Sequence, residues 1–326
     1  MADRALRLAT RGSPLARWQA GRVADLLVEA GCRPSLVVVE TDGDRRADVP
    51  IDRIGGQGVF VKEVQAAVAR GDADAAVHSA KDLPAGTGAS PLVLAAVPER
   101  ADPRDLLVGG ALDSLPAGAT VATGSARRRA QLANLRPDLT FTGLRGNLAT
   151  RLAAVGTRGI AAVMVAKAAV DRLDWRPPDG MQTEVLEPDI MVPQVGQGAL
   201  AVECRPGDDA TRSRLEAVHD VVAGPPVAAE RAYLAALGGG CTLPVGAYAA
   251  WTTEREEPGG REEGSGGRVI QLRGMIASGD GRVVLRHTRS GTDPEALGRE
   301  VARYLLEDAG GRDLGEWVPA PGEVMP

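Results

Sequence analysis

The chain has 326 residues, of which 44% are hydrophobic and 25% charged, and this balance is typical of a globular protein with about two or three domains. The net charge of −5 and the aromatic content of 3% argue against a general polyanion-binding protein and against a base-stacking surface for single-stranded nucleic acid. We therefore expect no nucleic-acid partner, and any cationic binding site must be local.

Three cysteines and three histidines are too few and too scattered for a disulfide framework or a metal site. We expect no metal and a reducing, cytoplasmic environment. The first residues, Met-Ala-Asp-Arg-Ala-Leu-Arg, lack the apolar core of a signal peptide. Because no apolar run is long enough to span a bilayer, we also expect no membrane association.

The first part of the chain alternates short apolar strands with helices. Strands are expected at residues 6–10, 35–40 and 75–78. Ser13 followed by Pro14 is typical of a helix start, and a second helix is expected over residues 59–70. The alternation predicts a mainly parallel sheet covered by helices. Residues 35–40 are almost wholly Val and Leu, which predicts cover on both faces of that strand.

The same pattern starts again after residue 105. Strands are expected at residues 106–108, 119–123, 139–144 and 160–165, each of the last three followed by a helix. Residues 8–13 and 121–125 both run from a strand through Thr to Gly-Ser and into a basic helix, which predicts two similar α/β lobes facing one another. Residues 194–205 are expected to cross back, which would make the first domain discontinuous.

The pattern changes from about residue 221. A helix at 226–237 precedes strands at 246–251, 269–276 and 282–289 and a final helix at 293–306. These elements predict a smaller α+β domain with an antiparallel sheet, whose last two strands form a hairpin. The expected domains are residues 1–98 with 197–218, residues 99–196, and residues 219–318, followed by a tail at 319–326.

Basic residues gather at the carboxyl ends of the predicted strands, where α/β sheets bind their ligands. Several also lie at helix N-termini, where free N–H groups favour anions, and arginine binds carboxylates through paired hydrogen bonds. The set is Arg11, Lys81, Arg127, Arg128, Arg145, Arg151 and Arg172. Together these residues predict a cleft for a ligand with several carboxylates or phosphates.

Three further residues are candidates for chemistry. Asp82 is the only carboxylate that we place in this cluster, where it could exchange protons or stabilise a cation; a helix cap or an ion pair is the alternative. Cys241 follows three glycines and could be an exposed thiol, or a buried residue under a helix C-cap. Lys81 is one of only three lysines, so either its titratable amine matters or arginine has replaced lysine elsewhere by chance. We interpret His78 as a hydrogen-bonded core residue.

Seven motifs together resemble the porphobilinogen deaminase family, in the family's order over residues 6–246. They lie at residues 10–16, 58–63, 78–84, 123–131, 144–152, 196–200 and 239–241. The resemblance implies two periplasmic-binding-protein-like lobes followed by a third, α+β domain. It also implies that four porphobilinogen molecules are deaminated and joined head to tail on an enzyme-bound dipyrromethane primer, and that water then releases hydroxymethylbilane.

The resemblance assigns roles to individual residues. Cys241 matches the cysteine that carries the dipyrromethane cofactor through a thioether. Asp82 matches the carboxylate that assists loss of ammonia and stabilises the cationic pyrrole. The family's cofactor-binding and substrate-binding positions are matched by Arg11, Ser13, Lys62, Lys81, Thr123, Ser125, Arg127, Arg128, Arg145, Gly146, Arg151, Arg172, Gln197 and Gly198.

The sequence also departs from the family. Gln57 stands where the family commonly has lysine, and residues 254–267 look like an insertion. We expect a monomer. The alternative, a two-lobed anion-binding protein without catalysis, explains the cationic cleft but leaves Cys241 without a role.

Overall fold

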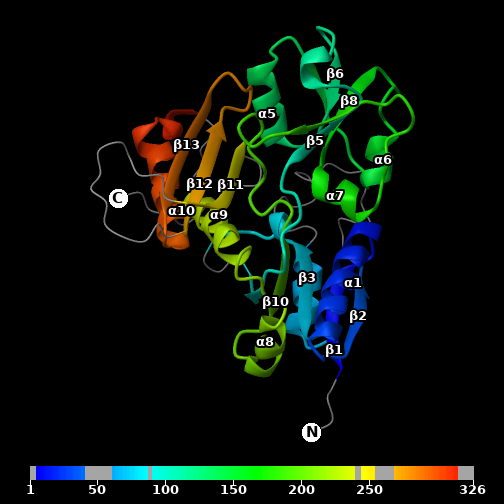
Figure 1. Cartoon of the computed structure of the whole chain (residues 1–326), viewed down its shortest axis with the longest axis vertical. Helices are drawn as coiled ribbons and strands as arrows, with labels where there is room; N and C mark the ends of the chain where they lie inside the picture. The colour runs from blue at the N-terminus through cyan, green and yellow to red at the C-terminus, as the bar shows by residue number, and fades with distance from the viewer. Residues whose placement is uncertain (1–4, 41–60, 87–89, 239–243, 254–267, 315–326) are drawn as a thin grey trace.

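The computed structural model describes residues 5–40, 61–86, 90–238, 244–253 and 268–314, which form three sheets with their helices (Figure 1). The Gly-Gly-Gln-Gly segment, Cys241 and residues 254–267 lie outside these ranges. The predicted class, two α/β lobes followed by a smaller α+β unit, is confirmed. The exact domain boundaries that we expect at residues 98, 196 and 218 stay a prediction.

The first sheet has five strands and is mainly parallel. Their order is β2 (Pro34–Val39), β1 (Leu6–Arg11), β3 (Ala75–Ser79), β10 (Leu200–Cys204) and β4 (Val93–Ala96). β1 pairs in parallel with β2 and β3, whereas β10 pairs antiparallel with β3 and β4, so β10 alone runs against the other four. The helices of this part are α1 (Pro14–Glu29), α4 (Lys62–Ala69) and α8 (Asp209–Glu216).

The second sheet repeats this topology. Its order is β7 (Thr140–Thr142), β6 (Thr120–Ala122), β8 (Ile160–Ala166), β5 (Asp105–Val108) and β9 (Thr183–Leu186). Here β5 alone runs against the others. The reversed strands β5 and β10 each follow a segment that crosses from one sheet to the other. The helices are α5 (Ala126–Leu135), α6 (Leu148–Leu152) and α7 (Lys167–Arg172).

The local repeat seen in the sequence has a structural cause. The Ser13 hydroxyl accepts a hydrogen bond from the Ala16 N–H at 3.3 Å, and the Ser125 hydroxyl accepts one from the Arg128 N–H at 3.4 Å. Ser13 is therefore the N-cap of α1, which follows β1, and Ser125 is the N-cap of α5, which follows β6. The strands β1 and β6 occupy the same position in their two sheets. The two Thr-to-Gly-Ser segments are thus equivalent strand-to-helix turns, which confirms the predicted pair of similar lobes.

One expectation about the first sheet is wrong. β2 is an edge strand, and Leu36 and Val38 are 42% and 47% exposed, so its two faces are not both covered. Val37 and Val39 point the other way and pack near Val64 of α4. The Val and Leu content of this strand reflects their preference for a half-buried pleated surface rather than full burial.

The third sheet is antiparallel and carries two helices. It consists of β11 (Val245–Thr253), β12 (Arg268–Ala277) and β13 (Val284–Gly291), with α9 (Gly224–Ala236) and α10 (Pro294–Arg303) packed against it. Tyr233 of α9 is fully buried in this core, and its hydroxyl donates to the Met275 carbonyl at 2.9 Å.

The buried carboxylate of Glu230 connects the third, α+β part of the chain with both segments that cross between the first two sheets. Glu230 of α9 accepts hydrogen bonds from Arg100 at 2.7 and 3.1 Å, from the Gly196 N–H at 2.7 Å and from the Ala249 N–H at 2.8 Å. Arg100 lies between β4 and β5, and Gly196 lies between β9 and β10. Because both carboxylate oxygens accept hydrogen bonds, these contacts offset the desolvation penalty of the buried charge, and they hold the crossings in place.

Candidate active site

The predicted cationic residues do lie at the carboxyl ends of parallel strands. Arg11 ends β1, and Lys81 and Asp82 form a single 3-10 turn, Ala80–Asp82, directly after β3. In the second lobe, Arg127 and Arg128 lie in the first turn of α5, which follows β6, whereas Arg172 is the last residue of α7, the helix that follows β8. The two sets face one another: the Arg172 guanidinium lies over the Trp18 ring of α1, 5.6 Å from its centroid.

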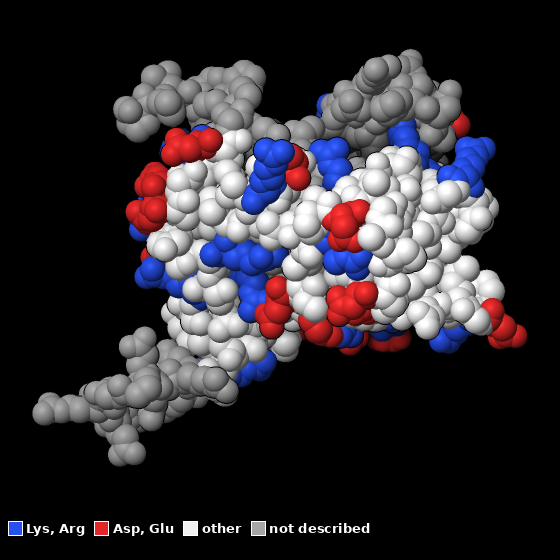
Figure 2. All heavy atoms as spheres, turned by 90° about the horizontal axis from the view of Figure 1, so that it is seen from above, with Lys and Arg blue, Asp and Glu red and all other residues white. Residues whose placement is uncertain are grey.

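Outside this region the charges are mixed. Acidic and basic side chains are interspersed over the face seen from above (Figure 2). A cavity of about 470 Å³ beside Arg104, Tyr248 and Arg273 contains none of the predicted site residues. On this face, therefore, the cations do not form a patch of one sign.

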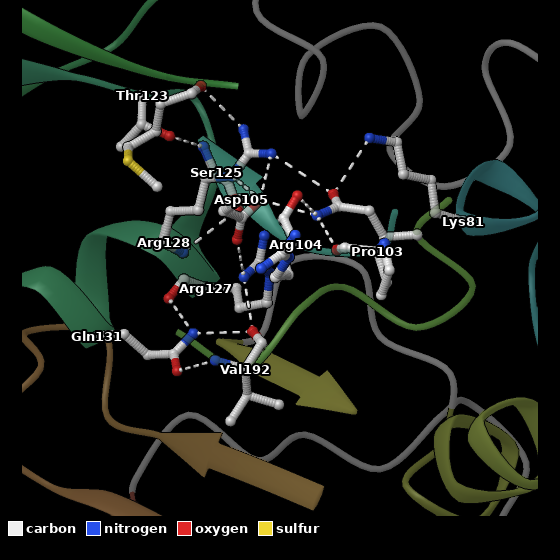
Figure 3. Close-up of polar contacts among 12 residues, drawn as sticks. Lys81, Pro103, Arg104, Asp105, Thr123, Ser125, Arg127, Arg128, Gln131 and Val192 are labelled. Atoms are coloured by element: carbon white, nitrogen blue, oxygen red, sulfur yellow. Dashed lines mark hydrogen bonds and ion pairs between the residues drawn. The ribbon is translucent and has the colours of Figure 1, made fainter. Parts of the chain in front are cut away.

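A hydrogen-bonded network joins the two lobes at this point (Figure 3). The side-chain amide oxygen of Gln197, Oε1, lies 3.4 Å from Lys81 Nζ and 3.5 Å from Arg128 Nη2. Gln194 Nε2 donates to the Lys81 carbonyl at 3.2 Å. Burial and the charge of Arg128 lower the pKa of Lys81 to about 8. Lys81 is thus an ammonium that can lose its proton near neutral pH, as arginine could not.

A second carboxylate occupies the centre of the network, so the expectation that Asp82 is the only one there is wrong. Asp105 is fully buried and accepts hydrogen bonds from Arg127 Nη1 at 2.7 Å and from Arg128 Nε and Nη2 at 3.0 and 2.8 Å. Burial raises the pKa of Asp105, but the charges of Arg127 and Arg128 outweigh it and hold that pKa well below its ordinary value. An aspartate that opens the apolar run Leu106–Val108 was the sequence signal for a buried ion pair.

Several buried guanidinium N–H groups have no hydrogen-bond partner within the described ranges. They are Arg127 Nε and Nη2, Arg145 Nη1 and Arg172 Nε. Burial lowers the pKa of Arg127, and it lowers that of Arg172 to about 10. Because an unmatched buried donor costs about 1–3 kcal/mol, these groups are suited to a ligand that supplies the missing acceptors. Carboxylates are such acceptors.

Arg151 interacts electrostatically with other charged residues of the predicted site. Burial and the charges of Arg128 and Arg145 lower the pKa of Arg151, whereas the charge of Asp82 raises it. Asp82 of the first lobe therefore acts electrostatically on Arg151 of the second. Arg151 Nε donates to the Gly146 carbonyl at 2.9 Å. Gly146 has φ +104°, and a side chain there would clash with Thr150.

Two predicted contact residues have clear structural functions. Gly198 has φ +85°, and a Cβ there would lie 2.3 Å from the Ala101 carbonyl oxygen, so only glycine lets the two crossing segments pack together. Its own carbonyl accepts a hydrogen bond from Arg172 Nη2 at 2.7 Å. Thr123 Oγ1 accepts from the Ser125 N–H at 3.2 Å, which shapes the turn before α5.

Other predicted residues lie apart from this network. Lys62 is exposed at the start of α4. His78 is buried, as expected of a core residue, but its Nε2, 3.4 Å from Glu203 Oε2, has no hydrogen-bond partner among the described residues. Cys241 lies outside the described residues. In the described ranges, no group of three or more His, Cys, Asp or Glu side chains could hold a metal ion.

Comparison with known proteins identifies the family. The model of "Porphobilinogen deaminase, dipyromethane cofactor binding domain" matches residues 6–213, and that of "Porphobilinogen deaminase, C-terminal domain" matches residues 226–307. The chain belongs to the porphobilinogen deaminase family. The porphobilinogen deaminases of Acidothermus cellulolyticus and Roseiflexus castenholzii are each 44% identical to it, over 98% and 95% of this chain and 93% and 98% of their own.

Family membership confirms the predicted activity and cofactor. The protein is a porphobilinogen deaminase, a transferase of tetrapyrrole biosynthesis that uses a dipyrromethane cofactor. Among solved structures, the chain is similar to a periplasmic substrate-binding protein of an ABC transporter from Coxiella burnetii, at 14% identity and a TM-score of 0.41 over 66% of this chain and 92% of that one. At that score the likeness adds nothing to the fold described above. Of the described helices, none is long and apolar enough to cross a membrane.

The lowered pKa of Lys81 leads to a prediction for the Cys241→Ser variant. In a Cys241→Ser protein labelled at lysine Cε, one of three lysine signals should titrate with a midpoint near pH 8, because burial and Arg128 disfavour the ammonium. The signal should lose its charged form as the pH rises through 8, and it should vanish in the Lys81→Arg protein. If every lysine signal kept its charged form up to pH 10, the electrostatics described for Lys81 would be wrong.

Proposed function

We propose that the facing strand ends of the two lobes form the site in which this porphobilinogen deaminase holds its cofactor and growing chain, and that Cys241 is the attachment residue. The observation that carries the proposal is a set of buried N–H groups on Arg127, Arg145 and Arg172 that have no partner in the described part of the chain. Each porphobilinogen brings two carboxylates, and carboxylates pair strongly with guanidinium groups that are already fixed in place.

The donor set fits a carboxylate-rich cofactor. Arg127 would offer Nε and Nη2, the two donors of one guanidinium edge, because its Nη1 is already engaged by Asp105 and by the Val192 carbonyl at 2.7 Å. Arg145 would offer Nη1, and Arg172 would offer Nε. When bound, the dipyrromethane supplies the pyrrole carbon to which the first substrate is joined.

Asp82 is the proposed catalytic residue. It lies in the short turn after β3, next to Lys81, and its charge reaches Arg151 on the opposite lobe. The carboxyl group of Asp82, when protonated, can deliver its proton to the aminomethyl nitrogen of porphobilinogen as ammonia leaves, and the carboxylate that this transfer produces can then stabilise the positive charge on the substrate pyrrole. The surrounding cations bind the substrate carboxylates and leave Asp82 as the anion beside the reacting end.

We also propose that the enzyme is a cytoplasmic monomer whose domains are residues 1–98 with 197–218, residues 99–196, and residues 219–318. Free thiols at the buried Cys204 and the half-buried Cys32 support a reducing compartment. The two crossings near residues 99 and 197 support the discontinuous first domain. A binding protein without catalysis is not favoured, because the whole chain matches an enzyme family.

Intact-mass spectrometry with limiting porphobilinogen tests the proposed site. The wild-type protein should show a series of added pyrrole units on the cofactor-bearing chain. Arg145→Leu should raise KM about tenfold or more, since it removes a charge-assisted contact worth about 1.5–3 kcal/mol.

Arg129→Leu is the matched control. Arg129 is an exposed cation on α5 that donates to the Gly279 carbonyl at 3.1 Å, away from the network. Its KM should stay near the wild-type value. Equal KM values for the Arg145→Leu and Arg129→Leu proteins would place the carboxylate site elsewhere.

A further inference from the structure

We propose that Asp105 is a positioning residue of this deaminase: it fixes the orientation of three side chains of the proposed site, Arg127, Arg128 and Gln197, and thereby sets which donors of Arg127 are left for the substrate. The inference rests on the site proposed above. Asp105 belongs to none of the motifs that pointed to that site.

The backbone that carries the Asp105 carboxylate is held by strand pairing on both sides. Asp105 is the first residue of β5, whose backbone is paired on both sides, with Ala166 of β8 and with Leu186 of β9. It is fully buried. A side chain anchored in the interior of a sheet, directly after a crossing between the lobes, can serve as a fixed reference point for residues from both lobes.

Asp105 determines which guanidinium N–H groups of Arg127 and Arg128 remain available to bind a ligand. Its Oδ2 accepts from Arg127 Nη1 at 2.7 Å, and this contact leaves Nε and Nη2 of Arg127 unpartnered among the described residues. Its Oδ1 accepts from Nε and Nη2 of Arg128, whose Nη1 donates to the Met164 carbonyl at 3.0 Å. Arg127 is therefore held as a donor toward ligand, while Arg128 is held mainly by the protein.

Asp105 also decides which way the Gln197 amide points. Gln197 Nε2 donates to Asp105 Oδ1 and to the Pro103 carbonyl, both at 2.8 Å, and these partners can only accept. The amide oxygen must then face Lys81 Nζ and Arg128 Nη2, which can only donate. No other orientation satisfies both ends of the amide. Without the carboxylate, only the Pro103 and Arg104 carbonyls, at 2.8 and 3.4 Å, would hold the NH₂ group on that side, and the amide would be less firmly oriented.

A purely stabilising role would have different consequences. If Asp105 only neutralised two arginines, its loss would lower thermal stability and would act on the Lys81 pKa through charge alone, with KM for porphobilinogen unchanged. The charges that face Lys81 are Arg127 and Arg128 from α5, Asp105 from β5 and the adjacent Asp82. Removing Asp105 deletes one of two anions in that set, so the Lys81 ammonium should lose its proton at lower pH.

The test compares Asp105→Asn with Asp74→Asn in the cofactor-bearing enzyme. Asp74 is a suitable control because it is also a buried carboxylate, paired with Arg7 at 2.8 Å, but it lies at the opposite end of the first sheet from Lys81. For Asp105→Asn we expect KM for porphobilinogen to rise at least fivefold and the alkaline limb of kcat/KM to move to lower pH. Asp74→Asn should lose thermal stability with KM and pH profile unchanged.

A second variant covers the case in which Asp105→Asn does not fold. Gln197→Leu removes the oriented amide and keeps the Asp105–arginine pairs, and it should also raise KM and shift the alkaline limb downward. If Asp105→Asn or Gln197→Leu matched the wild-type enzyme in KM and pH profile, the positioning role would be overturned. If Arg145→Leu alone raised KM, the proposed site would stand and only this inference would fall; if none of the three changed KM, the site itself would be wrong.

Discussion

Replacement of Asp82 by asparagine is expected to lower kcat about 10²- to 10⁴-fold, the range typical of losing a general acid or base. Asparagine has the same shape but can neither deliver a proton nor carry the negative charge that would stabilise a cationic pyrrole. Asp82 is half-buried in the turn directly after the buried strand β3. Its charge acts on both Lys81 and Arg151. The fold should persist, because the change leaves the strand and its packing intact.

Single-turnover measurement of ammonia release, together with intact mass and thermal unfolding, checks this result. The Asp82→Asn protein should keep the cofactor mass and the wild-type unfolding temperature while turnover collapses. Asp113→Asn is the matched control, since Asp113 is an exposed carboxylate in another 3-10 turn, Leu112–Ser114. Ammonia release at the wild-type rate in the Asp82→Asn protein would remove this residue from the mechanism.

Replacement of Cys241 by serine is expected to abolish activity and the covalent cofactor together. A serine hydroxyl cannot form the thioether, so the purified variant should have the mass of its sequence alone, whereas the wild-type protein should be heavier by a dipyrrole. Cys241 lies outside the described residues, and the prediction depends on the family match over residues 6–213 and 226–307.

The Cys241→Ser variant also tests the proposal that the cofactor carboxylates accept hydrogen bonds from the buried arginines. Without the cofactor, the buried donors of Arg127, Arg145 and Arg172 lose the acceptors that we propose for them, so the unfolding temperature should fall relative to the wild-type enzyme. Cys32→Ser is the control, because Cys32 is a half-buried thiol outside the site and should keep both mass addition and activity. A dipyrrole still attached to the Cys241→Ser protein would mean that another residue carries the cofactor.

Much of the fold followed from local rules. Ser13 and Ser125 mark helix starts because a serine cap acts on N–H groups three residues away, and this interaction is visible in the sequence. Three elements were not predicted, namely the four-residue strands β4 and β9 and the helix α8. The exposure of β2 depended on its place at the sheet edge, which residue type alone does not reveal.

By itself, the sequence determined that cations gather at the carboxyl ends of strands in two repeated lobes, because strand, turn and helix-cap signals act over a few residues. Only the tertiary structure decided which cations are free to bind ligand. Asp105 meets Gln197 across 92 residues of chain, and Glu230 meets Arg100 across 130. Such partners come together through the two crossings between the sheets, and no local periodicity encodes them.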